Sequence, residues 1–557
     1  MSHREVKLFG RRANRRTVVK AATGAAASFC AWGVAGKAYR RALAQESVKD
    51  QILAIPGPGA GAPTESDMER VGELCLRTQN RGKFQGQTVV FQGLSNAGFH
   101  VNVFRPLCRA WEEATGAKIE WIEVTQADSY PRMSQAISTG NIEFDVLEGS
   151  GTWEGELLGG GYCVPMPDWV RNDPGYDFDD IVPYLQGPTR TWDGVIYGAS
   201  IDGDMHHFNY RKDVFSDPGL AEEWKASGGE GEWGVPTSWQ QVQAYSQFLK
   251  GKEFEGQPLY GILDPLARGG GVGAYFFFSR ASAYAKHPDD PAFFFDPTDM
   301  TPKINSPAFV RALEDMIAAV DAAPPDQVNA DLLKTLGDFL AGTGTMVHWW
   351  ADVGSNVYTS DQSVVQDKVG VSILPGSPDV YNWQTKSWDT IPADATPAPG
   401  SAPGLNHAPY LAFLGWGLYV MKAAEERGVS EAAWDLVSHL TGKDISLWMM
   451  IYPSGMNPWR MSHFNAADWT IAGYPEAFAQ EYLDSIMNSY NHPNRIVDLR
   501  IPGAGQYLIA LEDEYTRAVA GEISAQEALD NAAAKWNEIT DQLGREQQLA
   551  LYQASLG

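Results

Sequence analysis

Strand-like and helix-like patterns alternate through the first third of the chain. Residues 88–92 are rich in β-branched and aromatic side chains, which predicts a strand. Apolar residues then recur on one helical face through residues 104–111, and Gly116 is expected to end that helix. Residues 119–124 alternate as a second strand, and residues 144–147 follow as a third. These strand–helix–strand units predict an α/β sheet with parallel strands and ligand loops at the strands' carboxyl ends.

Two glycine-containing strands mark the places where the chain is expected to cross between two bodies. Residues 195–215 open with a strand composition and contain Gly198 and Gly203, which relax the backbone where a strand could leave one sheet for another. Residues 414–420, Leu-Gly-Trp-Gly-Leu-Tyr-Val, repeat the pattern and predict a second crossing. The alternative for the first stretch is an ordinary strand–turn–strand with two solvated aspartates.

Length and composition predict a folded protein with two or more domains. The chain has 557 residues, which exceeds the size at which single hydrophobic cores stop growing. An apolar fraction of 44% and a charged fraction of 20% are ordinary for a soluble protein, so a disordered chain is not expected. The body of the chain has no run of eighteen uncharged apolar residues, so no membrane span is predicted either.

The first 44 residues have the features of an export signal. Residues 14–20, Asn-Arg-Arg-Thr-Val-Val-Lys, are similar to a twin-arginine motif. A weakly apolar segment follows at residues 21–36, and residues 42–44 form a small-x-small cleavage site. The alternative is a short amphipathic helix with a basic flank. We expect residues 1–44 to be removed and the remaining protein to reach the periplasm by the twin-arginine route.

The charge and the cysteines narrow the possible partners and scaffolds. The formal net charge is −26, and removal of a basic leader makes the remaining chain more acidic. Such a charge repels phosphate backbones and anionic lipids, so neither nucleic acid nor a membrane surface is an expected partner. Cys75, Cys108 and Cys163 remain after the leader, and this odd number excludes a disulfide-dense scaffold while leaving one bridge open.

Carboxylates and indoles recur at the predicted strand ends and crossings. They are accompanied by one arginine, and the set is Trp153, Asp202, Asp204, Trp349, Trp350, Asp352, Trp416, Trp459 and Arg460. Indole faces suit the C–H faces of a sugar, and charged side chains suit its hydroxyl groups. The alternative for any one tryptophan is packing in the core, so the interpretation holds for the set rather than for a single member.

Other chemistries have weaker support. Adjacent residues on a strand point to opposite faces, so His206 and His207 are not expected to share a metal, and no Cys/His/Glu cluster completes a site. Neither a Gly-x-Ser-x-Gly elbow nor a His-Glu-x-x-His motif occurs. We expect no metal and no cofactor. A glycosidase-like carboxylate pair stays open, because acidic residues are plentiful.

Seven short motifs occur in order between residues 87 and 543. They are Ala110–Gly116, Gly140–Val146, Tyr197–Phe215, Pro236–Trp239, Met346–Asp352, Val369–Gly376 and Gly415–Leu418. Their order and spacing resemble the extracellular solute-binding proteins of carbohydrate ABC importers, the group that includes the maltose-binding protein. The chain departs from many members by an extension at residues 45–85 and by an insertion at residues 377–409, expected as a long surface loop.

The resemblance implies a type II periplasmic-binding-protein fold, in which two α/β lobes joined by a hinge enclose the ligand. The chain would divide into a signal peptide, an N-terminal extension, a discontinuous first lobe, a second lobe, and C-terminal helices that pack on the second lobe. The corresponding residues are 1–44, 45–85, 86–198 with 417–490, 199–416, and 491–557.

The resemblance also implies a set of ligand contacts. Loops at strand ends would line the first lobe, the paired indoles and nearby acids would line the second, and the crossings and one late loop would complete the site. The expected residues are Ser95, Asn96, Glu148, Trp153, Asp202, Asp204, Trp349, Trp350, Asp352, Trp416, Gly417, Trp459 and Arg460.

The expected function is capture without catalysis. A monomeric periplasmic protein would bind a neutral sugar, polyol or short glycoside and deliver it to an ABC permease in the inner membrane. An anionic sugar is disfavoured, because the expected contacts are rich in carboxylates with only Arg460 opposing them. The alternatives are an exported carbohydrate-active enzyme of the glycoside hydrolase kind, and a structural or sensory module whose cleft docks a receptor.

Overall fold

The computed structural model describes residues 6–8, 11–13, 47–55, 63–95, 100–187, 189–360, 362–452 and 455–556. Two compact units are distinguished, Met1–Ala54 and Ile55–Gly557. In the first unit, β1 (Val6–Leu8) and β2 (Arg11–Ala13) form an antiparallel pair, and α3 (Val48–Leu53) is capped by the Ser47 hydroxyl. The predicted twin-arginine motif and cleavage site lie outside the described residues.

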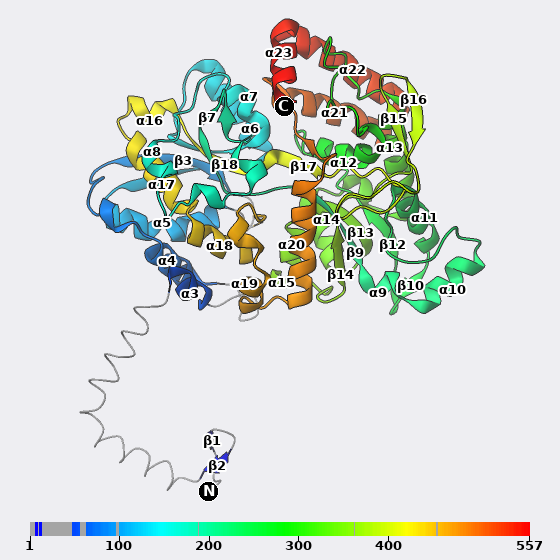
Figure 1. Ribbon diagram of the computed structural model, residues 1–557, viewed down its shortest axis with the longest axis horizontal. Helices are drawn as coiled ribbons and strands as arrows, with labels where there is room; N and C mark the ends of the chain where they lie inside the picture. Colours follow the sequence, from blue (N-terminus) through cyan, green and yellow to red (C-terminus); the bar gives the residue numbers. More distant parts are fainter. Residues whose placement is uncertain are drawn as a thin grey trace. The chain divides into compact units, whose positions relative to one another are not determined.

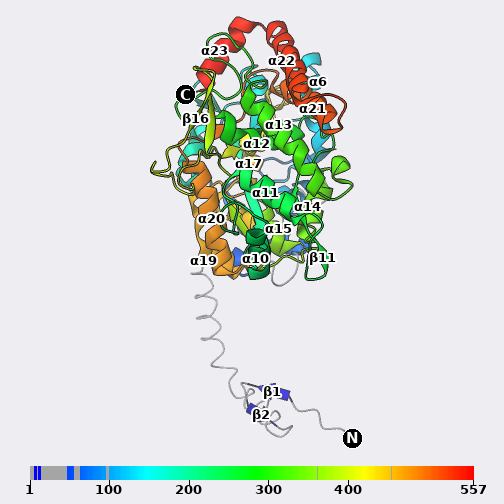
Figure 2. The same cartoon turned by 90° about the vertical axis from the view of Figure 1, so that its right-hand side faces the viewer.

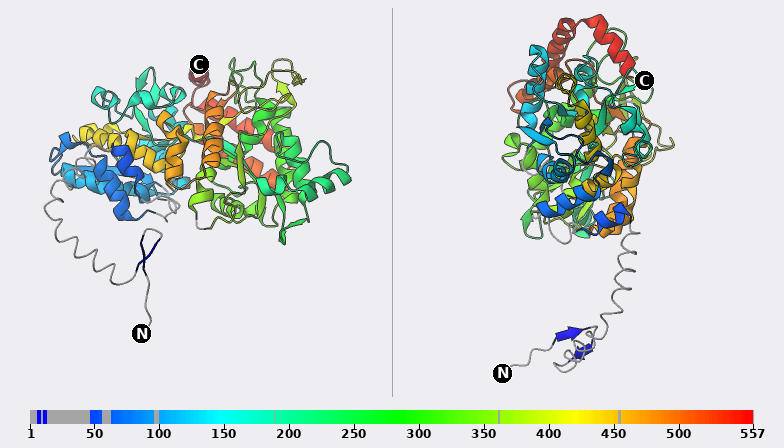
Figure 3. Two further views of the ribbon diagram at one scale, coloured as in Figure 1. Left: turned by 60° about the horizontal axis from the view of Figure 1, so that its bottom comes forward. Right: turned by 90° about the vertical axis from the view of Figure 1, so that its left-hand side faces the viewer.

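The first large sheet of the unit Ile55–Gly557 has the strand order β4-β3-β5-β18-β8. Its strands are β3 (Thr88–Leu94), β4 (Lys118–Val124), β5 (Val146–Ser150), β8 (Gly198–Ser200) and β18 (Trp416–Val420). β3 is parallel to β4 and β5, whereas β18 is antiparallel to β5 and β8. In Figures 1 and 3 the yellow segment with β18 accordingly lies among blue and cyan elements. This sheet therefore needs a strand from far along the chain.

The helices of this first half follow the predicted pattern. They are α4 (Glu65–Leu74), α5 (Val101–Thr115), α6 (Gln126–Thr139), α7 (Glu154–Leu157), α8 (Asp168–Arg171), α16 (Lys422–Glu426), α17 (Ser430–Leu440) and α18 (Lys443–Ile451). Gly116 and Gly140 end α5 and α6 in the left-handed conformation that glycine adopts without strain. The indole N–H of Trp111 donates to the buried carboxylate of Asp435 at 2.8 Å, which ties α5 to α17.

The second large sheet has the order β12-β13-β9-β14. Its strands are β9 (His206–Arg211), β12 (Tyr260–Leu263), β13 (Gly344–Trp350) and β14 (Val369–Ser372). β12 and β13 are parallel, and β9 is antiparallel to both β13 and β14. Every residue of β9 and β13 is buried, so these strands form the centre of this half.

The second half is covered by helices on the outside and has one helix buried all round. The helices are α9 (Lys212–Phe215), α10 (Pro218–Ala226), α11 (Trp239–Leu249), α12 (Gly273–Ala285), α13 (Pro307–Ala319), α14 (Leu332–Leu340), α15 (Val353–Thr359), α19 (Ala466–Ile471) and α20 (Glu476–Asn491). Figure 2 turns this half toward the viewer, with α11, α13 and α14 in front. α12 is buried along nearly its whole length. α20 packs on β14 and so belongs with the second sheet by contact.

The chain crosses between the two sheets at the predicted places. Residues 201–205 connect β8 of the first sheet to β9 of the second. Residues 412–415 lead into β18 from β17 (Tyr410–Leu411), which pairs with β19 (Ile496–Val497). Gly203 is required by close packing, because a Cβ there would lie 2.2 Å from the Tyr490 hydroxyl. The first predicted crossing therefore connects the two large sheets, and the second enters the first sheet from the separate β17–β19 pair.

The C-terminal helices pack on the second half. α21 (Ala504–Val519) contacts α12 and α13, and α22 (Ala525–Gln542) contacts α13 and α21. α23 (Arg545–Ser555) follows, and Figure 1 draws all three in red beside the green α12 and α13. No helix in the described part of the chain is long and apolar enough to span a bilayer.

The insertion at residues 377–409 differs from the expected loop. It contains an antiparallel hairpin of β15 (Asp379–Asn382) and β16 (Ser387–Thr390). The hairpin is held by the Asn382 side chain, which accepts from the backbone N–H groups of Gln384 and Thr385 in the turn. An asparagine side chain that bonds to the backbone of a turn is a local interaction. The Pro- and Ala-rich composition of residues 377–409 does not indicate it.

Candidate functional site

A small cavity lies where the two crossings meet the ends of β3 and β13. Its volume is about 90 Å³, and both halves of the unit contribute to its lining. The lining residues are Leu94, His100, Gln126, Asp202, Asp204, Leu332, Leu333, Leu336, Trp349, Trp350, Asp352, Phe413, Trp416 and Gly455. A cavity between two bodies with a few convergent polar groups is the usual form of a ligand site.

Aromatic rings form one wall of the cavity. The Trp350 and Phe413 rings stack with centroids 4.8 Å apart and planes 6° from parallel. Trp416 lies 5.5 Å from Phe413, and Trp349 meets Trp350 edge-on at 5.6 Å. Phe413 has a φ of 68°, a left-handed conformation that is strained for an aromatic residue. The second crossing therefore holds this ring against Trp350 at the expense of local backbone strain.

Three aspartates form the polar wall. Asp202 Oδ1 accepts from the backbone N–H of Asn457 at 2.7 Å, and Asp204 Oδ1 accepts from the Asn457 side-chain amide at 2.8 Å. Asp352 Oδ2 accepts from the amide of Asn356 at 2.9 Å. All three aspartates are 5% exposed or less. Asp352 Oδ1 has no hydrogen-bond partner among the described residues.

Burial and mutual repulsion shift the pKa values of these acids upward. Burial raises the pKa of Asp202 to about 6, although the charge of His100 and the N–H of Asn457 oppose the rise. Burial, reinforced by the charges of Asp202 and Asp352, holds the pKa of Asp204 well above its usual range. The pKa of Asp352 is also well above its usual range, because the group is buried and faces Asp202. The cleft therefore favours protonated carboxyl groups unless a cation enters.

His100 and Glu148 form a buried pair at the edge of the cavity. His100 Nδ1 contacts Glu148 Oε1, and Glu148 Oε2 accepts from the backbone N–H of Leu94 at 2.8 Å. Burial opposes a charged imidazole, but the charge and hydrogen bond of Glu148 outweigh it and raise the pKa of His100. The positive charge of His100 is thus directed mainly at Glu148, which stands behind the cavity wall.

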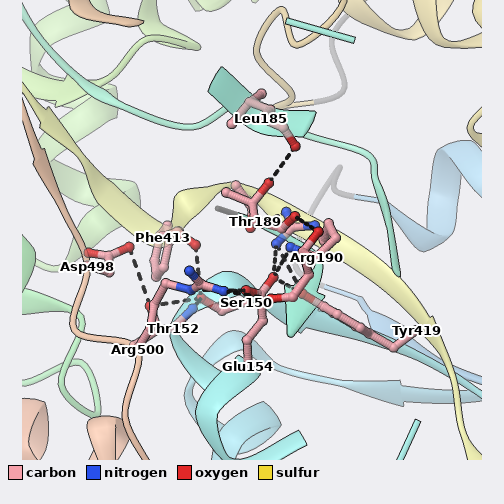
Figure 4. A network of polar contacts seen from close by, with 12 residues as sticks. Ser150, Thr152, Glu154, Leu185, Thr189, Arg190, Phe413, Tyr419, Asp498 and Arg500 are labelled. Atoms are coloured by element: carbon pink, nitrogen blue, oxygen red, sulfur yellow. Dashed lines mark hydrogen bonds and ion pairs between the residues drawn. The ribbon is translucent and has the colours of Figure 1, made fainter. Parts of the chain in front are cut away.

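A second polar network, drawn in Figure 4, ties the first half to the crossing segments. Glu154 Oε1 accepts from the Arg190 guanidinium at 2.8 Å and from the Tyr419 hydroxyl at 2.9 Å. Glu154 Oε2 accepts from Arg500 at 2.7 Å. Arg190 also donates to the carbonyl of Gly415 at 2.7 Å. One buried carboxylate therefore fixes the second crossing and the approach to the C-terminal helices.

This arrangement can be compared with known proteins. Residues 107–471, more than half of the chain, match the family described as bacterial extracellular solute-binding protein. The chain belongs to this family. A probable amino-acid ABC transporter periplasmic-binding protein of Sinorhizobium fredii is 20% identical over 307 residues. That alignment covers 54% of this chain, and this chain spans 64% of the length of that relative.

Solved structures of solute-binding proteins have the same two-lobed α/β fold. A protein of Agrobacterium vitis with bound D-mannitol is 19% identical with a TM-score of 0.61, and the match covers 82% of this chain and 99% of that one. A protein of Agrobacterium radiobacter in complex with ribitol is 20% identical with a TM-score of 0.62 and the same coverage. Maltose-bound MalE3 of T. maritima is 17% identical with a TM-score of 0.60, and the match covers 82% of this chain and 100% of that one.

The solute-binding fold brings together about half of the residues singled out from the sequence. Asp202, Asp204, Trp349, Trp350, Asp352 and Trp416 line the cavity. Two others stand directly behind the lining, since Glu148 contacts His100 and Trp153 meets Trp416 edge-on at 5.7 Å. Gly417 faces Arg190 instead, where a Cβ would lie 2.4 Å from Nε. The backbone N–H of Ser95 donates to the carbonyl of Val124 outside the lining, and Asn96 lies outside the described residues.

Trp459 and Arg460 lie in the interior of the solute-binding protein and do not line the cavity. Arg460 donates to the carbonyl groups of Asp177 and Thr441, both at 2.7 Å, and its guanidinium lies 4.3 Å from the Trp459 ring centroid. Both side chains are fully buried. Asn457, a few residues earlier in the same loop, contacts Asp202 and Asp204. The loop selected from the sequence is therefore near the cleft, but a different residue reaches it.

Several lining residues were not singled out from the sequence. His100 follows β3 and was within reach of the strand-end rule that selected Ser95. Phe413 precedes the glycine of the second crossing, which is a weaker signal. Leu332, Leu333 and Leu336 belong to α14, whose leucines are indistinguishable from core positions before the fold is known.

Proposed function

We propose that this protein is the binding subunit of an ABC importer and captures a sugar, polyol or short glycoside in the cavity between its lobes. The observation that carries the proposal is the cavity lining, which combines stacked aromatic rings with three buried carboxyl groups. Rings accept the C–H faces of such solutes, and carboxyl groups hydrogen-bond to their hydroxyls. The ligands of the similar structures, D-mannitol, ribitol and maltose, agree in class.

The lining disfavours a free amino acid, despite the name of the relative from Sinorhizobium fredii. An α-carboxylate needs a cationic partner, and none of the described lining residues is a lysine or an arginine. A compact solute fits better than a long chain, because the cavity volume is only about 90 Å³. The ligand set proposed for this cavity is His100, Asp202, Asp204, Trp349, Trp350, Asp352, Phe413 and Trp416.

Delivery to a membrane permease and export by the twin-arginine route complete the proposal. Export is supported by family membership and by the Arg-Arg motif at residues 15–16. Replacing both arginines with lysine should leave unprocessed protein in the cytoplasm, detected by fractionation and by mass. Periplasmic accumulation of the double variant contradicts this route but leaves the binding proposal intact.

The binding proposal is tested by a thermal-shift screen of purified protein against sugars, polyols and amino acids, followed by calorimetry of the hits. A true ligand at about 100 times its Kd adds about 2.7 kcal/mol of stability and raises Tm by several degrees. We expect a hit among sugars or polyols, with the solute recovered unchanged by mass spectrometry after long incubation. New product masses favour the enzyme alternative, and no shift with any solute favours the receptor-docking module.

A further inference from the structure

Within the described residues, the protein supplies no lysine or arginine to the three acids of the cavity. Asp202, Asp204 and Asp352 come from two separate segments, the first crossing and the end of β13, and converge on one small space. No lysine or arginine is found among the lining residues that the structure describes. The lining residue that can carry a positive charge is His100, and it contacts Glu148. Buried carboxyl groups without a counter-charge stay protonated, and a cation that entered among them would stabilise their charged form.

Two unpartnered polar atoms lie in the wall of the same cavity. Asp352 Oδ1 and Trp350 Nε1 are buried, and neither has a hydrogen-bond partner within the described residues. Their residues are 4% and 6% exposed, so bulk water does not satisfy them freely. Unsatisfied buried groups in a ligand cavity are the ones that a ligand is expected to pair. The carboxylate oxygen needs a donor, and the indole N–H needs an acceptor.

The missing donor is not a metal ion. No group of three or more His, Cys, Asp or Glu side chains in the described part of the chain is arranged to hold one. Aromatic rings instead surround the acids, with Trp350 and Phe413 stacked and Trp416 beside them. Ring faces attract organic cations, most strongly where the contact is shielded from water. Carboxylates and ring faces together select a cation that is attached to a carbon skeleton.

We infer that the solute taken by this cleft carries an ammonium group, held by Asp202, Asp204 and Asp352 while its carbon skeleton lies against Trp350, Phe413 and Trp416. The inference rests on the proposed function, because it names the ligand chemistry of the same cleft. It makes the solute an amino sugar, an amino polyol or a simple amine rather than the neutral compound expected from the sequence. The raised pKa values of the three acids fit this picture, since an entering cation would draw them into their charged form.

The test uses matched ligand pairs in which only the charged group changes. Affinities are measured by calorimetry at pH 7 for D-glucosamine against D-glucose and N-acetyl-D-glucosamine, and for 1-amino-1-deoxy-D-sorbitol against D-sorbitol. 1,4-Diaminobutane is a third arm that separates simple amines from amino sugars. We expect at least one amine to bind about tenfold or more tightly than its neutral partners.

The Asp352→Asn variant tests the mechanism. The substitution keeps the volume of the side chain and the bond to Asn356 while removing the charge. It should therefore weaken binding of the amine about tenfold more than binding of its neutral partner. The control is Asp289→Asn, which makes the same change of charge at a fully solvated position outside the cavity. Measurements at two salt concentrations separate a local contact from the general field of an acidic protein.

The outcomes distinguish the two proposals. Neutral members that bind as tightly as their amines, or an Asp352→Asn variant that weakens both equally, overturn the ammonium inference and leave the proposed function standing. Binding of the amines alone supports the inference. Absence of binding by every amine of the panel overturns the inference, whereas the proposed function is contradicted only when the broader sugar and polyol screen also gives no hit.

Discussion

At the scale of single residues, the chemistry of the cleft is set by burial rather than by residue type. Aspartates are common on the surface of this acidic chain, but Asp202, Asp204 and Asp352 share one buried space. Their raised pKa values follow from desolvation and from their mutual repulsion. The sequence predicted that these three aspartates lie at the cleft, but it carried no information on their charge state.

The first prediction concerns Asp202. Its pKa rises to about 6 in the folded protein, so its protonated form stabilises the fold below pH 4 and that stability is lost as the pH rises through about 6. Asp202→Asn does not titrate, and Asn can still accept from the backbone of Asn457. Between pH 4 and pH 7, the free energy of unfolding of the wild type should therefore fall by about 2 kcal/mol relative to that of the variant, as measured by urea unfolding. A difference that is constant across this range contradicts the assignment.

The second prediction concerns Trp416. It lines the cavity, and its ring contacts Phe413 and Trp153. Trp416→Ala should abolish solute binding by calorimetry, because the stacking surface is lost, while circular dichroism stays native. The control is Trp388→Ala, which removes a half-exposed indole of the β15–β16 hairpin outside the cavity and should bind normally. Unchanged affinity in Trp416→Ala refutes its place in the site.

At the scale of elements, the crossings position the site. Residues 201–205 carry two of the acids, and residues 412–416 carry two of the rings, so both walls depend on how these segments pass each other. Gly415 makes that passage possible. It has a φ of 69°, and a Cβ there would lie 2.0 Å from the carbonyl oxygen of Asp202. The glycine is needed for both its conformation and its lack of a side chain.

The third prediction compares Gly415 with a glycine that also has a positive φ but has open space around it. Gly428 also has a positive φ, of 71°, but nothing lies within 4 Å of a Cβ added there. Gly428→Ala should therefore lose about 1–2 kcal/mol from the left-handed conformation alone. Gly415→Ala should lose about 1–3 kcal/mol more, because of the overlap and because Gly415 has φ 69° and ψ 162°, a conformation that essentially only glycine adopts. It should also weaken binding by displacing Asp202. Equal losses of unfolding free energy in the two variants contradict the close passage of the crossings.

At the scale of the whole molecule, the unit Ile55–Gly557 is held together by contacts that are distant in sequence. Glu154 pairs with Arg190 and Arg500, and the backbone N–H of Gly503 donates to Glu156 at 3.1 Å. The C-terminal segment thus binds the first half, while α21 and α22 pack on the second. Removing one partner of such a buried ionic network leaves an uncompensated charge.

The fourth prediction concerns histidines buried in the interior of the protein. Burial lowers the pKa of His207 to about 3 and that of His439 to about 4, and it holds those of His206, His348 and His463 well below the usual value. Their neutral forms stabilise the fold above pH 6.5, and that stability is lost as the pH falls toward 4. The His207→Phe variant keeps a ring at this position but does not titrate. When the pH falls from 7 to 4, its free energy of unfolding should decrease by about 2–4 kcal/mol less than that of the wild type. An identical loss in both proteins by urea unfolding contradicts the neutral assignment.

The elements were largely predictable, because local patterns determine them. The strands at 88–94 and 118–124, the helix that ends at Gly116 and the two crossings all follow from apolar periodicity and glycine placement. The hairpin in the insertion was missed, because its strands are short and its turn depends on one asparagine. Lobe boundaries remain a prediction.

The candidate site was predictable only in part. Residues at strand ends and crossings, such as Asp204 and Trp350, were found because topology puts those positions together at the edge of a sheet. Arg460 was selected because its loop resembles a late ligand-contacting loop of the family, but its two terminal guanidinium nitrogens donate to backbone carbonyls within the protein. Asn457 and the leucines of α14 carry no sequence signal that separates ligand contact from packing.

The sequence by itself therefore determined the order of strands and helices, the family, and the residue types available for binding, because these depend on local periodicity and on motifs in fixed order. Only the tertiary structure decided which side chains share the cavity, which are consumed by internal bonds, and what charge the acids bear. Those properties depend on burial and on neighbours brought from distant parts of the chain, and no local pattern encodes them.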